Sequence, residues 1–142
     1  MESNFVRRSS SIGRHLMHIS FKVKYCHEVF EYKEVESLCR NIFLKTAEDI
    51  GIDIQELGFD KDHTHMIADI GLRSVPEVSK YLKGRSGYKI LKAFPWLKKK
   101  YFWGSGFWNP TTYFDSVGDN KGRITNYVKN QGRQTKMKYF LN

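Results

Sequence analysis

The chain has 142 residues, the length of one compact domain, and 40% of them are hydrophobic and 15% aromatic, so it can bury a core and is not a disordered polyelectrolyte. Lysine and arginine number 24 against 15 acidic residues, which gives a formal net charge of +9 and favours a polyanionic partner. Aromatic residues interleaved with the cations favour nucleic acid over an acidic membrane surface, and the lack of a long apolar run excludes a transmembrane helix.

The first fourteen residues contain no apolar stretch of the kind a secretory signal needs, and we expect residues 1–14 to form a mobile basic tail. From His15 to Tyr25 apolar and polar residues alternate, which predicts a half-buried strand with a basic, solvent-facing side. Apolar residues at helical spacing then predict a helix over residues 33–51, with Gly51 as its natural end.

The middle of the chain has the pattern of a hairpin followed by a helix. Residues 52–59 and 63–70 are predicted strands, and residues 60–62, with the sequence DKD, form the turn between them. A second long helix is predicted over residues 74–94, where Ser74 can act as the N-cap, and the glycines in its basic middle weaken it.

The last third adds a strand and a short helix. Residues 97–116 are predicted to form an aromatic, glycine-containing strand or hairpin, and residues 120–136 a helix broken by Gly132. This order predicts an α+β fold: a ferredoxin-like βαββαβ antiparallel sheet with helices on one face, plus a C-terminal helix. Without a repeat or a linker, we expect one domain over residues 15–134 and a basic C-terminal tail over residues 135–142.

Two histidines, His63 and His65, lie two apart in the predicted third strand. Side chains at that spacing share a face, with Cα atoms roughly 6.5–7 Å apart, so two imidazoles can converge on one divalent ion. A chance pair on a solvent-facing strand is common, and the pair by itself leaves both interpretations open. The opposite parity, from Thr64 to Ile70, suits a core, and Asp69 is too far along the strand to complete the site.

Tyr127 and Gln131 lie one turn apart on the predicted C-terminal helix, so they are neighbours on one helix face. A glutamine carbonyl oxygen can ligate Mg²⁺ or Mn²⁺, and a tyrosine beside it could attack a phosphate polarised by that ion. Helix periodicity by itself favours the alternative, in which Tyr127 packs with Ile124 and Val128.

Three blocks, KDHTHMIADI, YLKGRSGYKIL and YVKNQ, occur in this order on matching strands and helices. Together they resemble the small single-tyrosine transposases of bacterial and archaeal insertion sequences, the TnpA-type members of the HUH nuclease superfamily. The resemblance extends over roughly His15 to Gln131. It implies a ferredoxin-like domain in which His63, His65 and Gln131 bind Mg²⁺ or Mn²⁺ and Tyr127 is the nucleophile.

The resemblance also implies the reaction. Tyr127 would attack a phosphodiester of single-stranded DNA, leaving a 5′-phosphotyrosine and a free 3′-OH, and the 3′-OH of another strand would resolve the link. Such enzymes act as homodimers in which the tyrosine helix can work in trans, recognise DNA hairpins at element ends, and are expected in the prokaryotic cytoplasm, with no membrane partner. The alternatives are a domesticated repeat-associated tyrosine nuclease and a non-catalytic ferredoxin-like nucleic-acid-binding module.

Further residues are expected at the DNA. Three lie in the stretch that matches a DNA-contacting segment of the family, and two flank the tyrosine: Lys83, Arg85, Ser86, Arg123 and Lys129. One residue departs from the family pattern, because Thr64 stands where a bulky hydrophobe is usual and turns a hydroxyl toward the core.

Other groups are less specific. The lysine run at residues 98–100 is typical of a solvated surface. Trp103, Phe107 and Trp108 could stack on bases, although packing in the core or in a dimer interface is the favoured interpretation. The two cysteines and the histidines of the N-terminal third show no zinc-ligand spacing, and we interpret them as structural.

Overall fold

The computed structural model describes residues 6–8 and 11–117. The elements of these residues, in chain order, are β1 (Val6–Arg8), β2 (Ser11–Gly13), β3 (Leu16–Val23), η1 (Lys24–Cys26), η2 (Val29–Glu31), α1 (Lys33–Ile50), β4 (Asp53–Phe59), β5 (His63–Asp69), α2 (Val75–Ala93), α3 (Pro95–Leu97), η3 (Lys98–Phe102) and β6 (Trp108–Ser116).

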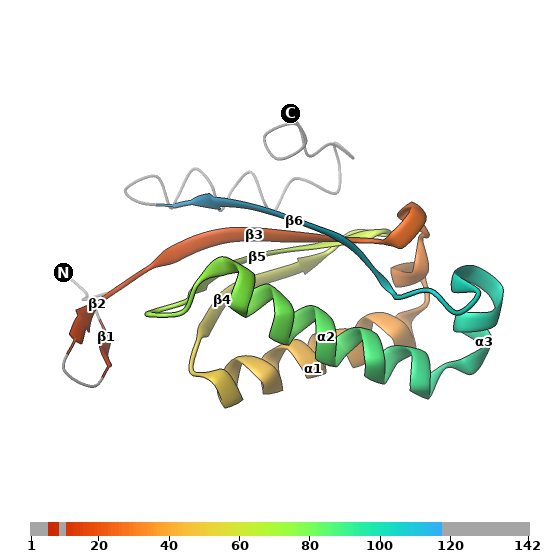
Figure 1. The fold of residues 1–142 in the computed structure, drawn as a ribbon, viewed down its shortest axis with the longest axis horizontal. Helices are drawn as coiled ribbons and strands as arrows, with labels where there is room; N and C mark the ends of the chain where they lie inside the picture. The colour runs from red at the N-terminus through yellow and green to blue at the C-terminus, as the bar shows by residue number, and fades with distance from the viewer. Residues whose placement is uncertain (1–5, 9–10, 118–142) are drawn as a thin grey trace.

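The main sheet has four strands in the order β4-β5-β3-β6, and every neighbouring pair is antiparallel. Helices α1 and α2 pack side by side along one face of it (Figure 1). Each helix connects two parallel strands that are separated by an antiparallel one, so the ferredoxin-like α+β prediction is confirmed. Strands β1 and β2 pair as a separate ribbon within the segment expected to be a mobile tail.

Both long helices begin and end as their sequences dictate. Helix α1 stops at Gly51, which adopts the left-handed conformation (φ 77°) and donates its N–H to the carbonyl of Ala47. Helix α2 starts with a capping box, in which the Ser74 hydroxyl accepts a hydrogen bond from the Glu77 N–H (3.2 Å) and the Glu77 carboxylate accepts one from the Ser74 N–H (3.3 Å). The helix then runs without interruption to Ala93.

The core lies between the sheet and the helices, and the strands supply it with alternate residues. In β3 and β5 these are Met17, Ile19, Phe21, Val23, Met66 and Ala68, and Ile70, directly after β5, joins them. Phe21 contacts Phe43 of α1 edge-on, with ring centroids 5.9 Å apart, and Trp108 of β6 at 5.8 Å. The predicted parity of both strands is therefore confirmed, and the histidines of β5 lie on the face opposite α1 and α2.

The opposite side of β3 was predicted to be solvated, and that prediction is wrong for its first half. His18 and Ser20, on the central strand β3, are buried. Leu16 forms a small apolar cluster there with Ile67 and Val117.

The prediction for residues 97–116 is also wrong in its first part. Pro95 starts a new helical turn, and helical backbone continues to Phe102 because Leu97 and Phe102 are both buried against the core. The strand begins only at Trp108. The predicted helix over residues 120–136 lies outside the described residues.

Candidate functional site

His63 and His65 lie at the start of β5, on the sheet face opposite the helices. Their rings are 5.7 Å apart between centroids and inclined by 51°. Both side chains are nearly enclosed, with 4% and 6% of their surfaces exposed. The two imidazoles are therefore neighbours, as predicted, and both are buried.

The ring of His63 is oriented by the turn that precedes it. Its Nδ1 lies 2.8 Å from the carboxylate of Asp62, and Nδ1–H donation to this acceptor leaves Nε2 with the lone pair. That Nε2 is buried and has no hydrogen-bond partner among the described residues, and Asp60 lies 3.9 Å away. The hydrogen bond from His63 also lowers the pKa of Asp62, so the carboxylate stays ionised.

The ring of His65 lies against the backbone of β4. Gly58 is its register partner, and a Cβ at position 58 would collide with Cε1 of the imidazole. Burial, helped by repulsion from His63, lowers the pKa of His65 to about 4. The imidazole is therefore neutral at physiological pH, and its buried Nδ1 lacks a hydrogen-bond partner in the part of the chain that is described.

Sequence patterns missed the neighbours of the pair. His18 of β3 is a third buried imidazole on this face, and burial together with repulsion from His65 lowers its pKa to about 3. Lys22 is the register partner of His63, and its charge contributes to the lowered pKa of Asp62. The signal was the shared parity of His18 and Lys22 in one strand, but only the pairing register shows which residues of β5 they face.

The histidine pair has the chemistry of part of a metal site. Metal ligation needs ring nitrogens with unengaged lone pairs. His63 Nε2 and His65 Nδ1 are buried without a hydrogen-bond partner among the described residues, and the lowered pKa of His65 keeps its imidazole neutral. No group of three His, Cys, Asp or Glu side chains that could hold an ion occurs within residues 6–8 and 11–117. Asp69 accepts hydrogen bonds from the N–H groups of His15 and Gly71, so its carboxylate has a structural role.

The remaining predicted site residues fall elsewhere. Four of them lie outside the described residues: Tyr127, Gln131, Arg123 and Lys129. Thr64 points into the core, where its hydroxyl is buried without a hydrogen-bond partner among the described residues, as its departure from the usual hydrophobe suggested.

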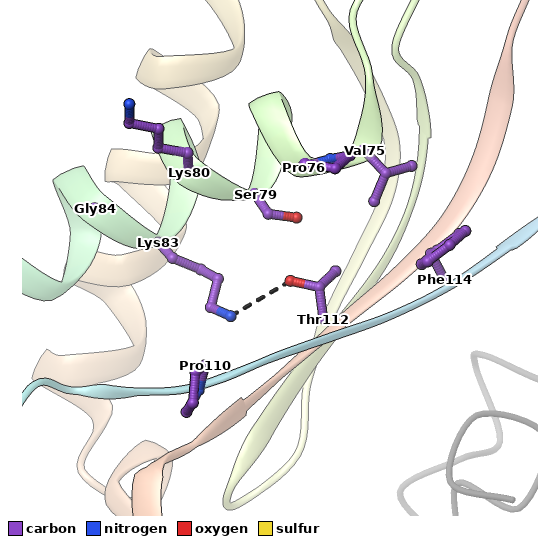
Figure 2. Close-up of a pocket in the computed structure, with 9 residues that line it drawn as sticks. All are labelled: Val75, Pro76, Ser79, Lys80, Lys83, Gly84, Pro110, Thr112 and Phe114. Carbon is purple, nitrogen blue, oxygen red and sulfur yellow. Dashed lines mark hydrogen bonds between the residues drawn. The ribbon is translucent and has the colours of Figure 1, made fainter.

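Lys83 points from α2 toward β6. Its ammonium donates to the carbonyl of Thr111 (3.2 Å) and to the Thr112 hydroxyl (3.4 Å), and burial lowers its pKa. It borders a groove of about 510 Å³ between α2 and β6, and Phe114, which also lines this groove, is exposed. Figure 2 shows Lys83 and Phe114 at opposite ends of the groove and Lys80 directed away from β6. Lys83 therefore joins helix and strand and still borders an open concave surface.

Arg85 and Ser86 are both engaged within the fold. Arg85 forms an ion pair with Asp49 of α1 (2.9 Å), and its hydrogen bond lowers the pKa of that carboxyl. Ser86 is fully buried, donates to the Leu82 carbonyl and accepts from the Trp108 indole N–H (2.8 Å). The expected DNA contact of the Ser86 side chain is thus wrong for this structure, because the hydroxyl anchors β6 to α2.

The comparison with protein families shows the family of the chain. Residues 11–131 match the family model described as "Transposase IS200 like". The chain belongs to this family. The IS200-like transposases are enzymes of DNA transposition.

Individual transposases agree with this assignment. The transposase of insertion sequence element IS200 from Salmonella typhimurium is 35% identical over 125 residues, which cover 84% of this chain and 78% of that protein. The ISDra2 transposase TnpA of Deinococcus radiodurans is 29% identical over 116 residues, covering 80% and 81%.

Solved structures share the fold. A Deinococcus radiodurans R1 protein described as a transposase has a TM-score of 0.70 at 26% identity, covering 89% of this chain and 97% of that one. A REP-associated tyrosine transposase bound to a REP hairpin has a TM-score of 0.64 at 12% identity, covering 92% and 73%. No helix among the described residues is long and apolar enough to span a membrane.

Proposed function

We propose that this IS200-like transposase cleaves and rejoins single-stranded DNA through a covalent 5′-phosphotyrosine, with Tyr127 as the nucleophile and Mg²⁺ or Mn²⁺ as cofactor. The observation that carries the proposal is the buried pair of imidazoles, whose nitrogens His63 Nε2 and His65 Nδ1 lack hydrogen-bond partners among the described residues. A protein that only binds DNA gains nothing from burying such groups, since an unpaired polar atom costs stability.

His63 and His65 would hold the ion together with Gln131. Asp62 fixes the tautomer of His63, and the backbone at Gly58 sets the plane of His65. When bound, the ion would withdraw charge from a phosphate oxygen and so make the phosphorus a better electrophile.

Tyr127 would carry the covalent step. Its phenolic oxygen attacks the phosphorus and gives its proton to a base or to water, and the O3′ of the cleaved strand leaves, taking a proton from that base or from water to become a free hydroxyl. The 3′-OH of the strand to be joined then attacks the phosphotyrosine and releases the tyrosine, so the bond energy is conserved and no ATP is needed.

We also propose a homodimer, with the tyrosine helix acting in trans, and DNA hairpins as the recognised ends. The hairpin in the related REP-associated structure supports this substrate class. Lys83, at the edge of the groove between α2 and β6, and Arg85, Arg123 and Lys129 would contact the backbone of the DNA, and the net charge of +9 favours such contacts.

A second function has one observation in its favour. The similarity in fold to a REP-associated tyrosine transposase is compatible with a domesticated nuclease that processes repeats without mobilising an element. Both functions use the same tyrosine chemistry. They are separated by whether the protein joins an excised, element-like circle or only cleaves and religates repeat hairpins.

The test incubates the purified full chain with single-stranded hairpin DNA and Mn²⁺ and looks for a protein–DNA adduct that survives denaturation. We expect an adduct with the wild type and with the control Tyr88→Phe, whose ring is exposed on α2, and none with Tyr127→Phe. An adduct with Tyr127→Phe contradicts the nucleophile, and an adduct yield unaffected by EDTA contradicts the cofactor.

A further inference from the structure

A row of aromatic rings runs across the end of the molecule that holds the turn before His63. The rings contact one another in sequence: Tyr25 and His27 have centroids 5.8 Å apart, His27 and Tyr101 4.8 Å, Tyr101 and Tyr32 6.5 Å, and Tyr32 and Trp96 5.0 Å. We call these five residues, together with Trp103, which caps the end of η3 two residues after Tyr101, the aromatic row. It brings together η1, α3, η3 and the start of α1, segments far apart in sequence.

The row begins beside the histidine site. The N–H of Val23, two residues before Tyr25, donates to the carbonyl of Asp62, which precedes His63 (2.9 Å). In Figure 1 the orange turn that follows β3 and the teal turn labelled α3 lie at the same end of the molecule. The row therefore lies at the end of the molecule where β5 begins.

The backbone at two exposed aromatic residues of this region is strained. Tyr25 (φ 62°), Cys26 (φ 57°) and Trp103 (φ 47°) are the non-glycine residues with positive φ within residues 6–8 and 11–117. Bulky residues rarely adopt this conformation, and such strain concentrates at functional sites. Burial of the side chains does not offset this strain energy, because Tyr25 is 64% and Trp103 84% exposed.

Cations line the same surface. Lys24 lies over the Tyr25 ring at 5.8 Å, and Lys100 lies over the Tyr101 ring at 5.2 Å and 3.5 Å from the Tyr32 hydroxyl. Lys98 and Lys99 are exposed on the same turn. Two acids adjoin row residues in the sequence: Glu31 is paired with Lys61 at 3.7 Å, and Glu28 is exposed. Lys24 and the three lysines of residues 98–100 outnumber them, so the row combines exposed rings with an excess of positive charge.

We propose that the aromatic row binds the single-stranded part of the DNA, with unpaired bases stacked on Tyr25, Trp96 and Trp103 and phosphates at Lys24 and the lysines of residues 98–100. Every base has a face that can stack on a ring, so the contact tolerates any sequence. The proposal rests on the proposed function, since it assigns the path of the strand toward the histidine pair.

The first test measures the Kd for an oligothymidylate of about 16 nucleotides by fluorescence anisotropy. Tyr25→Asn and Trp103→Asn remove the exposed rings, and asparagine tolerates the left-handed backbone, so both variants keep the fold. Tyr88→Ala is the matched control, because Tyr88 is 66% exposed with Lys92 over its ring at 5.6 Å, compared with 64% and 5.8 Å at Tyr25.

We expect each row variant to raise Kd about fivefold or more, the double variant to raise it further, and the control to stay within about twofold. A double variant that binds like the wild type overturns the proposal. So does a double variant that alters only self-association in sedimentation, because the row would then be a protein interface.

Photo-cross-linking locates the strand independently of affinity. Oligonucleotides with single 5-iododeoxyuridines should cross-link to peptides containing residues 24–27 or 96–103, as identified by mass spectrometry, and cross-links confined to other peptides contradict the row. Adduct formation is scored on the same samples. Row cross-links without a Tyr127 adduct contradict the proposed function alone, and adducts with unchanged binding by the row variants contradict the row alone.

Discussion

The side chains on the two faces of β5 are buried to almost the same extent but have different roles. On the helix side, Met66 and Ala68 are fully buried in a continuous apolar core. On the other side, His63 and His65 are 4% and 6% exposed and keep ring nitrogens without partners among the described residues. Burial on the helix side stabilises the fold. Burial of unpaired ring nitrogens on the other side costs stability and leaves lone pairs that can bind an ion.

This difference indicates which face of β5 serves the function and which face stabilises the fold. Apolar contacts explain every helix-side residue of β5 except Thr64, whose buried hydroxyl lacks a partner in the described part of the chain. On the histidine side, Asp62 and Gly58 orient imidazoles that contribute nothing to the core. Substitutions on the two faces should therefore separate stability from activity.

The largest effect is expected for Met66→Ala. Removing this fully buried side chain leaves a cavity under α1 and α2 and should lower the free energy of unfolding by about 2–5 kcal/mol. Urea unfolding followed by circular dichroism measures it. Activity per folded molecule should remain close to wild type. A loss of activity in fully folded Met66→Ala would contradict the assignment of stability to the helix side and of activity to the histidine side.

His65→Ala should have the opposite profile. Losing a ligand should reduce adduct formation by more than about 100-fold, while the free energy of unfolding changes by less than about 1.5 kcal/mol, because the removed ring nitrogen made no hydrogen bond with the described residues. Single-turnover adduct kinetics and urea unfolding test both parts. Near-normal kinetics would mean that the histidine face is not the site of the chemistry.

Gly58→Ala tests whether the backbone of β4 sets the plane of His65. The added methyl group collides with the imidazole, so the ring must rotate or β4 must shift, which should cost about 1–3 kcal/mol of stability and weaken Mn²⁺ binding. The double variant Gly58→Ala/His65→Ala should recover the stability. If it does not, the collision involves the backbone and not the imidazole.

The histidine face should also make stability depend on pH. His18 and His65 have folded-state pKa values of about 3 and about 4, below the usual 6.5 of the unfolded chain. Between each folded-state pKa and 6.5, the unfolded chain therefore binds more protons than the folded one. Unfolding free energy should therefore fall as pH drops from 6.5 toward 4, by about 1.4 kcal/mol per pH unit for each histidine. In EDTA-treated samples, His18→Gln should show a shallower slope than the wild type, and an equal slope would contradict this cause.

Much of the fold followed from local patterns. Period-two alternation in β3 and β5 placed Phe21 and Met66 on the core side, and Ser74 and Gly51 marked helix ends through their capping chemistry. The His-x-His spacing placed both rings on one face. These features depend only on neighbours in sequence, which is why sequence could predict them.

What sequence missed depends on contacts between distant segments. His18 is buried on the central strand β3, and Ser86 is buried because the Trp108 indole reaches it across the fold. The left-handed backbone at Tyr25 interrupts an alternation that looked like continuing strand. None of these contacts leaves a periodic signal in the chain, so pairing register had to be known first.

The most direct test of the histidine site is a Mn²⁺ titration of the purified full chain, followed by electron paramagnetic resonance. The wild type should bind the ion, and His63→Ala and His65→Ala should each weaken binding by more than about tenfold, while the control Met66→Leu leaves it unchanged. Equal Mn²⁺ affinity in the wild type and both histidine variants would contradict the assignment of this face of β5 as the metal site.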